Sequence, residues 1–308
     1  MKTWSDDKPV GFAAPTALAD SATAQEWGRA SRAWWESKPM RYDWHTPIAA
    51  EPLSSAWFAE IDRRFFSGAR VYMPWREKPF DQLIPYGELA DKRVLEVGVG
   101  LGSHAQLLAS AAQSFVGIDL TDYAARATRR RLELAGLNGQ VCRMDAERLA
   151  LEDASIDMVW SWGVIHHSPD TRQALHEIHR VLKPGGSAIT MVYHRSLWLW
   201  WVLGFAAHGV MRGRLAELGT IHRVVQEVTD GAIARFYKPR EWRALCQEFF
   251  TVERLKVFGA TNELLPLPHG RLKDAMAAMM PGSVVRLLCN RLRFGSFLVT
   301  VLRKPGSH

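Results

Sequence analysis

The sequence predicts an α/β protein built on a Rossmann-like, doubly wound sheet of seven strands, with an N-terminal helical cap and helical insertions in the C-terminal third. Two observations carry this prediction. Residues 94–104 read Val-Leu-Glu-Val-Gly-Val-Gly-Leu-Gly-Ser-His, an apolar strand that runs into a Gly-x-Gly-x-Gly turn. A second apolar strand follows and ends in Asp119. A strand, a glycine turn, a helix and a carboxylate at the next strand end form the geometry that holds a nucleoside-bearing cofactor.

Strands and helices alternate regularly from about residue 92 to residue 193. Continuous or alternating apolar runs predict the strands, and polar segments with apolar residues at helical spacing predict the helices between them. The expected strands are Arg93–Val97, Ser114–Asp119, Gln140–Met144, Ile156–Trp160 and Ser187–Tyr193, and the expected helices are Ser103–Ser110, Tyr123–Ala135 and Asp170–Leu182.

The segments on either side of this core have a different pattern. Residues 1–75 contain two expected helices, Ala22–Trp35 and Ser54–Phe66, and form the predicted cap. Residues 76–195 form the predicted cofactor-binding core. Residues 196–308 contain helical insertions and two last strands, Phe249–Phe258 and Ser296–Leu302, and we expect this region on the acceptor side.

The composition narrows the class of protein. A hydrophobic content of 47% and a charged content of 23% are typical of a soluble globular protein. The three cysteines are widely separated, which predicts a reducing compartment and no structural metal site. The N-terminus leads into no apolar segment, so we expect no secretory signal and a cytoplasmic protein.

The net charge of +7 is unevenly distributed. Residues 195–308 hold 17 Lys and Arg against 8 Asp and Glu, so the basic excess belongs to the C-terminal third. Such an excess is either an ordinary solvated face or a surface for anionic lipid or an acidic substrate. We expect no nucleic-acid partner, because no binding motif accompanies the charge.

Two details of the glycine turn distinguish between cofactors. Nicotinamide-binding turns usually place a third glycine where this chain has Ser103. Glu96, two residues before the first glycine, is unfavourable beside a pyrophosphate but favourable beside a positively charged group. S-adenosylmethionine carries an ammonium and a sulfonium, and it fits both details.

Five motifs in order resemble those of the class I S-adenosylmethionine-dependent methyltransferases, in particular the group with a "methyltransferase type 11" core. They span about residues 92–195 and consist of Val94-Leu-Glu-Val-Gly-Val-Gly-Leu-Gly102, Gly117-Ile-Asp119, Met144-Asp-Ala-Glu147, Ile156-Asp-Met-Val-Trp-Ser-Trp-Gly-Val-Ile-His-His167 and Leu182-Lys-Pro-Gly-Gly186. The resemblance implies methyl transfer with S-adenosylmethionine as the cofactor.

The resemblance also implies roles for single residues. Glu96 and the backbone of the glycine turn would face the methionine part, and Asp119 would accept hydrogen bonds from the ribose hydroxyls, with Leu120 beside the adenine. Asp145 and the Ala146 N–H would contact the adenine, and Ser161 and Trp162 would line the reactive end. The implied cofactor-binding set is Glu96, Gly98, Gly100, Gly102, Asp119, Leu120, Asp145, Ala146, Ser161 and Trp162.

Three histidines near predicted strand ends are candidates for a general base, which the reaction requires only if the acceptor arrives protonated. They are His167, our first choice, His166 and His194. The alternative for each is a buried histidine that only hydrogen-bonds its own loop.

Two further segments are candidates for contact with the acceptor. Tyr42 and Trp44 form either an aromatic lid or part of the core. Residues 196–211 carry three tryptophans with arginines at both ends, but their number falls short of the roughly 20 needed to cross a bilayer. This segment fits an interfacial helix that makes peripheral membrane contact through Trp198–Trp201, a lid over an apolar acceptor, or simple burial in the core or a dimer interface.

The sequence therefore predicts a methyltransferase that acts on an O, N or C nucleophile of a small, apolar or lipid-linked acceptor. Two alternatives remain: a catalytically silent S-adenosylmethionine-binding partner subunit, and a nicotinamide-dependent oxidoreductase, against which Ser103 and Glu96 argue. The sequence leaves the oligomeric state open.

Overall fold

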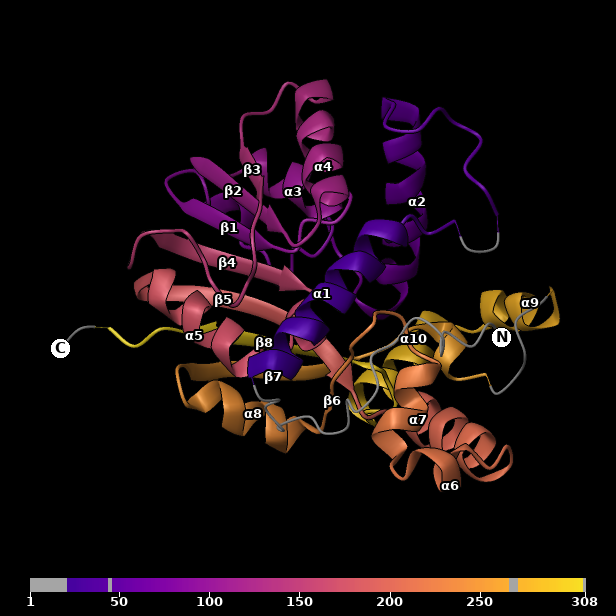
Figure 1. Cartoon of the computed structure of the whole chain (residues 1–308). Helices are drawn as coiled ribbons and strands as arrows, with labels where there is room; N and C mark the ends of the chain where they lie inside the picture. Colours follow the sequence, from indigo (N-terminus) through magenta and orange to yellow (C-terminus); the bar gives the residue numbers. More distant parts are fainter. Residues whose placement is uncertain (1–20, 44–45, 266–270, 307–308) are drawn as a thin grey trace.

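A central, mainly parallel sheet organises the computed structural model, which describes residues 21–43, 46–265 and 271–306 (Figure 1). Its strands are β1 (Arg93–Val97), β2 (Ser114–Asp119), β3 (Gln140–Arg143), β4 (Ile156–Trp162), β5 (Leu182–His194), β6 (Phe236–Tyr237), β7 (Thr251–Phe258) and β8 (Phe297–Arg303). The main strand order is β3-β2-β1-β4-β5-β8-β7, and β8 runs antiparallel to both neighbours. The fold class predicted from the sequence is thus confirmed.

The sheet holds one strand more than predicted. β6 has only two residues and pairs with Tyr193 and His194 of β5, to one side of the main path. A pair of residues is too short to produce a readable alternation of apolar and polar positions, so the sequence pattern could not show it.

Helices cover both faces of the sheet, as in a doubly wound fold. α3 (Ser103–Ala109) and α4 (Asp122–Leu134) pack on one face with α2 (Ser55–Tyr72), and α5 (Thr171–Val181) and α8 (Pro239–Gln247) pack on the other. Successive residues of each strand pack into the cores on opposite faces of the sheet. Val94 packs on the face covered by α2, α3 and α4, and Leu95 packs on the face covered by α5 and α8. The strand order reverses between β1 and β4, which is where such folds bind ligands.

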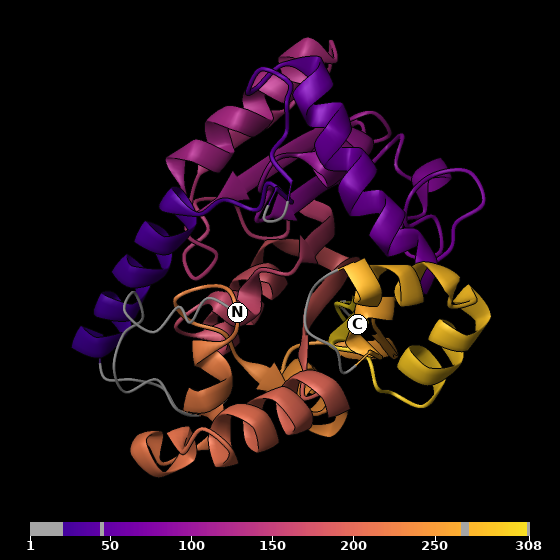
Figure 2. The ribbon, with the colours of Figure 1, turned by 90° about the vertical axis from the view of Figure 1, so that its right-hand side faces the viewer.

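The remaining helices stand around the carboxyl ends of the strands. These elements are α1 (Ser21–Ser37), the π-helix η4 (Leu197–Val210), α6 (Arg214–Leu218), α7 (Ile221–Glu227), α9 (Arg271–Met279), α10 (Gly282–Val285), the π-helix η6 (Arg286–Arg291) and the short 3-10 turns Ile165–His167 and Thr261–Glu263. A third 3-10 turn, Tyr86–Glu88, instead precedes β1 at the amino ends of the strands. Figure 2 looks at this end of the molecule, with α1 and α2 in indigo and violet and the later helices in salmon and gold.

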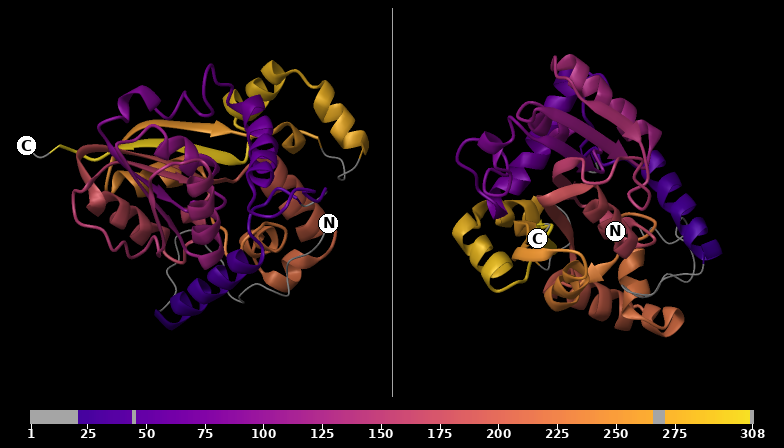
Figure 3. Two further views of the ribbon diagram at one scale, coloured as in Figure 1. Left: turned by 90° about the horizontal axis from the view of Figure 1, so that it is seen from above. Right: turned by 90° about the vertical axis from the view of Figure 1, so that its left-hand side faces the viewer.

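The helices of the C-terminal third belong to two insertions between strands of the sheet. The salmon helices η4, α6 and α7 lie between β5 and β6, and the gold helices α9, α10 and η6 lie between β7 and β8. Figure 3 shows the gold helices extending past the sheet. The helical stretch expected over Leu264–Leu288 is divided, with residues 266–270 outside the described part of the chain.

Candidate functional site

A cavity of about 580 Å³ lies at the carboxyl edge of the sheet, where the strand order reverses. Its walls come from the ends of β1, β2, β4, β5 and β8, the loop after β3, and helices α1 and α2. Ligands of open α/β sheets bind at this edge.

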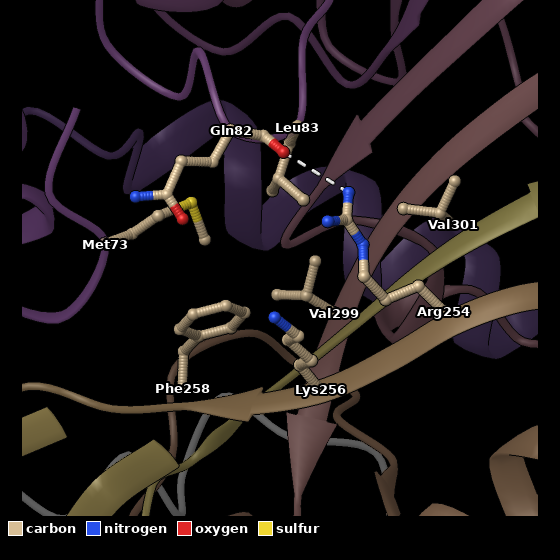
Figure 4. A pocket seen from close by; sticks show the side chains of 8 residues that line it. All are labelled: Met73, Gln82, Leu83, Arg254, Lys256, Phe258, Val299 and Val301. Carbon is tan, nitrogen blue, oxygen red and sulfur yellow. Dashed lines mark hydrogen bonds between the residues drawn. The ribbon is translucent and has the colours of Figure 1, made fainter. Parts of the chain in front are cut away.

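A second hollow is far too small to compete. It measures about 10 Å³, which is room for a single water molecule. Figure 4 shows Arg254 and Lys256 of β7 on one side and Gln82 and Leu83 on the other, with Arg254 Nη2 donating to the Gln82 carbonyl at 3.2 Å. The large cavity is therefore the candidate site.

The glycine turn forms the floor of the cavity between β1 and α3. Gly98 has φ of +80°, and a Cβ at this position would collide with the side chain of Val164. The Gly98 and Val99 amides both donate to the Ile118 carbonyl, which ties the turn to β2. Only glycine permits this backbone path at such close approach. Gly98 and Gly100 both line the cavity, as predicted.

Glu96 lies under this turn as a buried carboxyl group. It is 2% exposed, and its Oε2 has no hydrogen-bond partner among the described residues. Burial raises the pKa of Glu96 well above its usual range, and the nearby Asp119 adds to the effect. A buried carboxyl oxygen that faces a cavity without a partner is suited to a positively charged ligand group.

His104 of α3 completes this corner of the cavity. Burial lowers its pKa to about 3, so the ring is neutral, and its Nε2 also has no partner in the described structure. The ring packs among Phe65, Phe80 and Trp160, at centroid distances of 5.0–5.2 Å. His104 could not be selected from the sequence, because its place in the cavity depends on the aromatic residues that surround it.

Asp119 is held rigidly at the end of β2. Its carboxylate accepts from the Gly100 amide at 3.1 Å and from the Thr121 amide and hydroxyl at 3.0 and 2.7 Å. Burial raises its pKa despite these bonds. A carboxylate has about four acceptor positions, so Asp119 can still accept from ligand hydroxyls.

Three of the remaining predicted cofactor residues line the cavity beyond Asp119. Leu120 follows it directly, and Asp145 and Ala146 lie in the loop after β3. Asp145 Oδ1 accepts from the Glu147 amide at 2.9 Å, which fixes the loop.

Two predicted cofactor residues lie elsewhere. Trp162 lines the cavity, but its neighbour Ser161 is fully buried on the opposite face of β4, because successive strand side chains point to opposite faces. Gly102 does not line the cavity; it packs against Thr128 and Arg131 of α4, whose atoms would lie 3.0 Å from an added Cβ. Ser161 and Gly102 therefore do not line the cavity, and their role as cofactor contacts stays a prediction.

The three candidate histidines differ in their position relative to the cavity. His167 lines the cavity, and its Nδ1 hydrogen-bonds the Ile233 carbonyl. His166 is fully buried outside the lining, with both ring nitrogens unpartnered in the described part of the chain. His194 is also outside it and hydrogen-bonds the Gly295 carbonyl at 2.8 Å. His166 and His194 are thus poorly placed to act as bases.

Comparison with known proteins shows which family this part of the chain resembles. Residues 95–190 match the family model described as "Methyltransferase domain". The segment is a methyltransferase domain. It resembles the phthiotriol/phenolphthiotriol dimycocerosates methyltransferase 1 of Mycobacterium ulcerans, with 41% identity over 101 residues that cover 32% of this chain and 36% of that protein. The chain thus spans little more than a third of that relative's length.

A second relative matches over a longer stretch. The ubiquinone biosynthesis O-methyltransferase of Aromatoleum aromaticum is 28% identical over 193 residues, which cover 61% of this chain and 80% of that protein. The methyltransferase domain and part of its surroundings are therefore shared with an O-methyltransferase.

Solved structures with the same fold include both methyltransferases and another enzyme class. A chain in the complex of the Haloferax volcanii Trm112 methyltransferase activator with a methyltransferase has a TM-score of 0.51 and 17% identity, over 82% of this chain and 96% of that one. The [4+2]-cyclase SpnF has a TM-score of 0.50 and 16% identity, over 96% and 100%. At such identities the likeness concerns the fold alone, so the reaction has to be inferred from the site.

The N-terminal helices close the cavity of the methyltransferase domain from above. Tyr42 lines the cavity, and its ring lies 5.4 Å from that of Phe65 on α2, while Trp44 falls outside the described residues. Trp35 of α1 meets the His167 ring edge-on at 5.0 Å. Glu36 accepts from the Asp122 and Tyr123 amides at 2.8 and 3.1 Å, which fastens α1 to the start of α4.

Trp35, Tyr193 and Asp230 line the cavity, and sequence reasoning missed them. Each lies outside the five motifs or between them, and no local pattern marks it. Asp230, which follows α7, and Tyr193, near the end of β5, could have been noted only as polar residues beside predicted strand ends.

Residues 196–211 form a helix, as the sequence predicted, but as a π-helix with a buried and an exposed side. Trp200 is 3% exposed and packs against Phe236, whereas Trp201 is 45% exposed. No helix in the described part of the chain is both long and apolar enough to cross a membrane. Within the same described residues, no three His, Cys, Asp or Glu side chains are grouped to hold a metal ion.

Proposed function

We propose that this chain binds S-adenosylmethionine and transfers its methyl group to an O, N or C nucleophile of a small, apolar or lipid-linked acceptor. The observation that carries the proposal is the cavity itself. It combines the unpartnered, buried carboxyl of Glu96 with Asp119 at the next strand end, and its further walls are largely apolar.

The residues present fit the cofactor. Glu96 would face the ammonium group, which satisfies its free Oε2 and favours its charged form. Asp119 would accept from the ribose hydroxyls, with Leu120 beside the adenine. Asp145 and the Ala146 N–H would meet the adenine edge. Gly98 and Gly100 carry no side chain that could obstruct this approach.

S-adenosylmethionine, when bound, supplies a methyl carbon already activated by the sulfonium, so the chain needs chiefly to orient the acceptor and exclude water. Helices α1 and α2 cover the cavity and serve the second purpose. His167 lines the cavity and would take the proton of an acceptor that arrives protonated.

Two relatives support an apolar acceptor. The name of the M. ulcerans protein describes methylation of phthiotriol and phenolphthiotriol dimycocerosates. The name of the A. aromaticum protein describes an O-methylation in ubiquinone biosynthesis. The lining agrees with this, since Trp35, Met40, Tyr72 and Met191 contribute much of the wall away from Asp119.

Two experiments separate this proposal from its alternatives. S-adenosylhomocysteine should raise the melting temperature while NADH should not, and the reverse would indicate an oxidoreductase. Incubation with methyl-labelled S-adenosylmethionine and a cell extract should then label a product in the organic phase. A cofactor-induced stabilisation without any labelled product would favour the silent partner subunit, and label confined to the aqueous phase would exclude an apolar acceptor.

We also propose a cytoplasmic protein that touches anionic membranes peripherally. The exposed side of η4 carries Leu197, Trp201, Val202, Val210 and Met211, which we call the η4 apolar face. Leu197 lies four and five residues before Trp201 and Val202, which is about one turn of a π-helix, and Met211 lies nine residues after Val202, which is about two turns, so these residues share one side. The exposed side chain of Arg212 follows Met211, and apolar residues beside a basic one suit a bilayer interface.

A neighbouring helix extends this apolar side of the molecule. On α9, Leu272, Met276 and Met279 are 68%, 41% and 83% exposed, at helical spacing. Lys273 Nζ lies 6.0 Å from the ring centroid of Trp198, so α9 and η4 adjoin. An exposed apolar area of this kind on a soluble protein usually marks an interaction site, and the basic C-terminal third favours an anionic lipid surface.

A further inference from the structure

A fourth carboxylate of the cavity lies apart from the cofactor residues. Asp230 lines the cavity and accepts from the Tyr193 hydroxyl, which is 2.9 Å from Oδ1 and 3.1 Å from Oδ2. Glu96, Asp119 and Asp145 are the other acidic residues of the lining, and all three belong to the ends of β1, β2 and β3. Asp230 therefore serves a different part of the ligand space.

The sheet geometry gives the separation. Tyr193 is on β5, and the strand order β2-β1-β4-β5 places three strand spacings between β5 and Asp119 at the end of β2. At about 4.8 Å a spacing, this amounts to roughly 14 Å. Asp230, which is hydrogen-bonded to the Tyr193 side chain of β5, therefore lies on the β5 side of the cavity, apart from the predicted cofactor residues at the ends of β1, β2 and β3.

Tyr193 is a rigid support for this carboxylate. Its ring lies between His166 and Phe236, at centroid distances of 4.0 and 5.4 Å. Burial raises the pKa of Tyr193 well above its usual range, and the Asp230 charge adds to this effect. The hydroxyl therefore stays protonated and donates a hydrogen bond to Asp230.

The loop that carries Asp230 is also fixed. Gly231 has φ of +79°, and an added Cβ would lie 2.6 Å from His167 Nδ1. The Gln226 side chain donates to the Gly231 carbonyl at 3.3 Å and accepts from the Ala234 amide. Thr229 Oγ1 donates to the Val225 carbonyl at 2.7 Å. A carboxylate held from both sides is preorganised for a ligand.

We propose that Asp230, held in place by Tyr193, is the acceptor-recognition residue of the cavity and accepts a hydrogen bond from a hydroxyl group of an otherwise apolar acceptor. This inference rests on the proposed function, and it narrows the nucleophile to an alcohol or phenol oxygen. Asp230 is the binding residue, and Tyr193 is a positioning residue that acts through it.

Chemistry favours a hydroxyl over an amine as the partner of Asp230. A protonated amine held by a carboxylate has no lone pair with which to attack a methyl carbon. A hydroxyl that donates to Asp230 keeps its oxygen lone pairs free, and the hydrogen bond increases their electron density. As one lone pair forms the bond to the methyl carbon and the bond from that carbon to sulfur breaks, the hydroxyl proton passes along the hydrogen bond to Asp230, and His167 of the same lining is the base that takes it up. Asp230 is the one acidic residue of the lining that lies apart from the predicted cofactor residues, so it matches an acceptor with one O–H at its reactive end.

Binding of three small probes tests the subsite without any turnover. The probes are 4-butylphenol, its methyl ether 4-butylanisole, and 4-butylbenzylamine, each titrated by tryptophan fluorescence into the full chain saturated with S-adenosylhomocysteine. The wild type should bind the phenol about 10- to 100-fold more tightly than the ether, as for a hydrogen bond to a charged group. Asp230→Ala should remove this preference by weakening the phenol alone.

Two further variants keep the result interpretable. Tyr193→Phe should reduce the preference without abolishing it, since the carboxylate remains but loses its support. Asp122→Ala, on the surface of α4, should leave it unchanged. S-adenosylhomocysteine must still raise the melting temperature of each variant, which separates failure of this subsite from failure of the proposed function.

Three outcomes would overturn the inference. They are equal binding of the phenol and the ether by the wild type, an unchanged preference in Asp230→Ala, and tighter binding of the amine than of the phenol. The last outcome would make the subsite a cation site.

Discussion

Glu96 and His104 lie side by side under the glycine turn, with Glu96 Oε1 3.9 Å from His104 Nδ1. They are not an ion pair. Burial raises the pKa of Glu96 well above its usual range, which favours the uncharged carboxyl, and it lowers the pKa of His104 to about 3, so the His104 ring is neutral near pH 7. The corner that would meet the ligand's ammonium group thus holds a carboxyl group whose charged form a cation would stabilise.

We therefore expect ligand binding to release a proton from Glu96. The ammonium of S-adenosylhomocysteine favours the carboxylate form, so affinity should rise as pH rises toward the raised pKa of Glu96. Isothermal titration calorimetry in phosphate and in Tris should give different observed enthalpies. Glu96→Gln should bind about 10- to 100-fold more weakly and give the same enthalpy in both buffers. Buffer-independent enthalpy in the wild type would contradict the assignment.

His104 predicts how stability changes with pH. Its folded-state pKa of about 3 is lower than the value of about 6.5 in an unfolded chain, so below pH 6.5 the unfolded state binds the extra proton. The free energy of unfolding should fall as pH drops from about 6.5 toward 3. Urea unfolding at several pH values should show a flatter dependence for His104→Leu across this window. Parallel curves for the two proteins would show that His104 is not the group responsible.

Asp119 should be essential for cofactor binding but not for the fold. Asp119→Ala removes the carboxylate proposed to accept from the ribose, and it also frees the Gly100 and Thr121 amides. The melting-temperature increase with S-adenosylhomocysteine should disappear. Asp122→Ala is the matched control, because Asp122 is exposed at the start of α4 and pairs with Arg32 and Arg143, whose side chains are also exposed. A variant of Asp119 that keeps the full increase would remove this residue from the site.

The part of the cavity proposed for the cofactor could be predicted from the sequence because its residues lie next to one another in the chain. Glu96, Gly98 and Gly100 occupy one strand and its turn, and Asp119 ends the next strand. Parallel strands bring their carboxyl ends to one edge, so reading the strands already assembles these residues. Ser161 was included for its place at a strand end, whereas its side chain belongs to the other face of the sheet.

The acceptor half could not be predicted, because its residues meet only through tertiary packing. Asp230 and Tyr193 are 37 residues apart and are joined by a hydrogen bond. Trp35 reaches His167 from a helix that precedes the sheet. Neither contact can be predicted from local periodicity. The two-residue strand β6 is likewise too short to produce a recognisable sequence pattern.

His167 should affect turnover but not cofactor affinity. It lines the cavity, whereas His194 is buried outside it and hydrogen-bonds the Gly295 carbonyl. If His167 is the general base, His167→Gln should lower the rate of methyl incorporation into lipid extract by about 10²- to 10⁴-fold. The dissociation constant of S-adenosylhomocysteine should stay the same, and His194→Gln should retain most of the activity. Full turnover in His167→Gln would leave the reaction without a need for this base.

The η4 apolar face should bind anionic bilayers. Trp201 and Met211 are 45% and 82% exposed, and Arg212 adjoins them, so they can enter the headgroup region while the arginine meets anionic lipid. The protein should co-sediment with phosphatidylcholine vesicles that contain phosphatidylglycerol, less so at high salt, and little with pure phosphatidylcholine. The double variant Trp201→Ser, Met211→Ser should bind roughly tenfold more weakly.

Leu134→Ser provides the matched control for this measurement. Leu134 is 38% exposed at the end of α4, away from the insertions, so its replacement removes a similar exposed side chain without touching the η4 apolar face. The variant should sediment like the wild type. If the wild type instead ignores vesicles and forms a dimer that the Trp201→Ser, Met211→Ser variant abolishes, the face is a contact between two copies of the chain. The apolar side chains on η4 would then be buried by protein rather than by lipid.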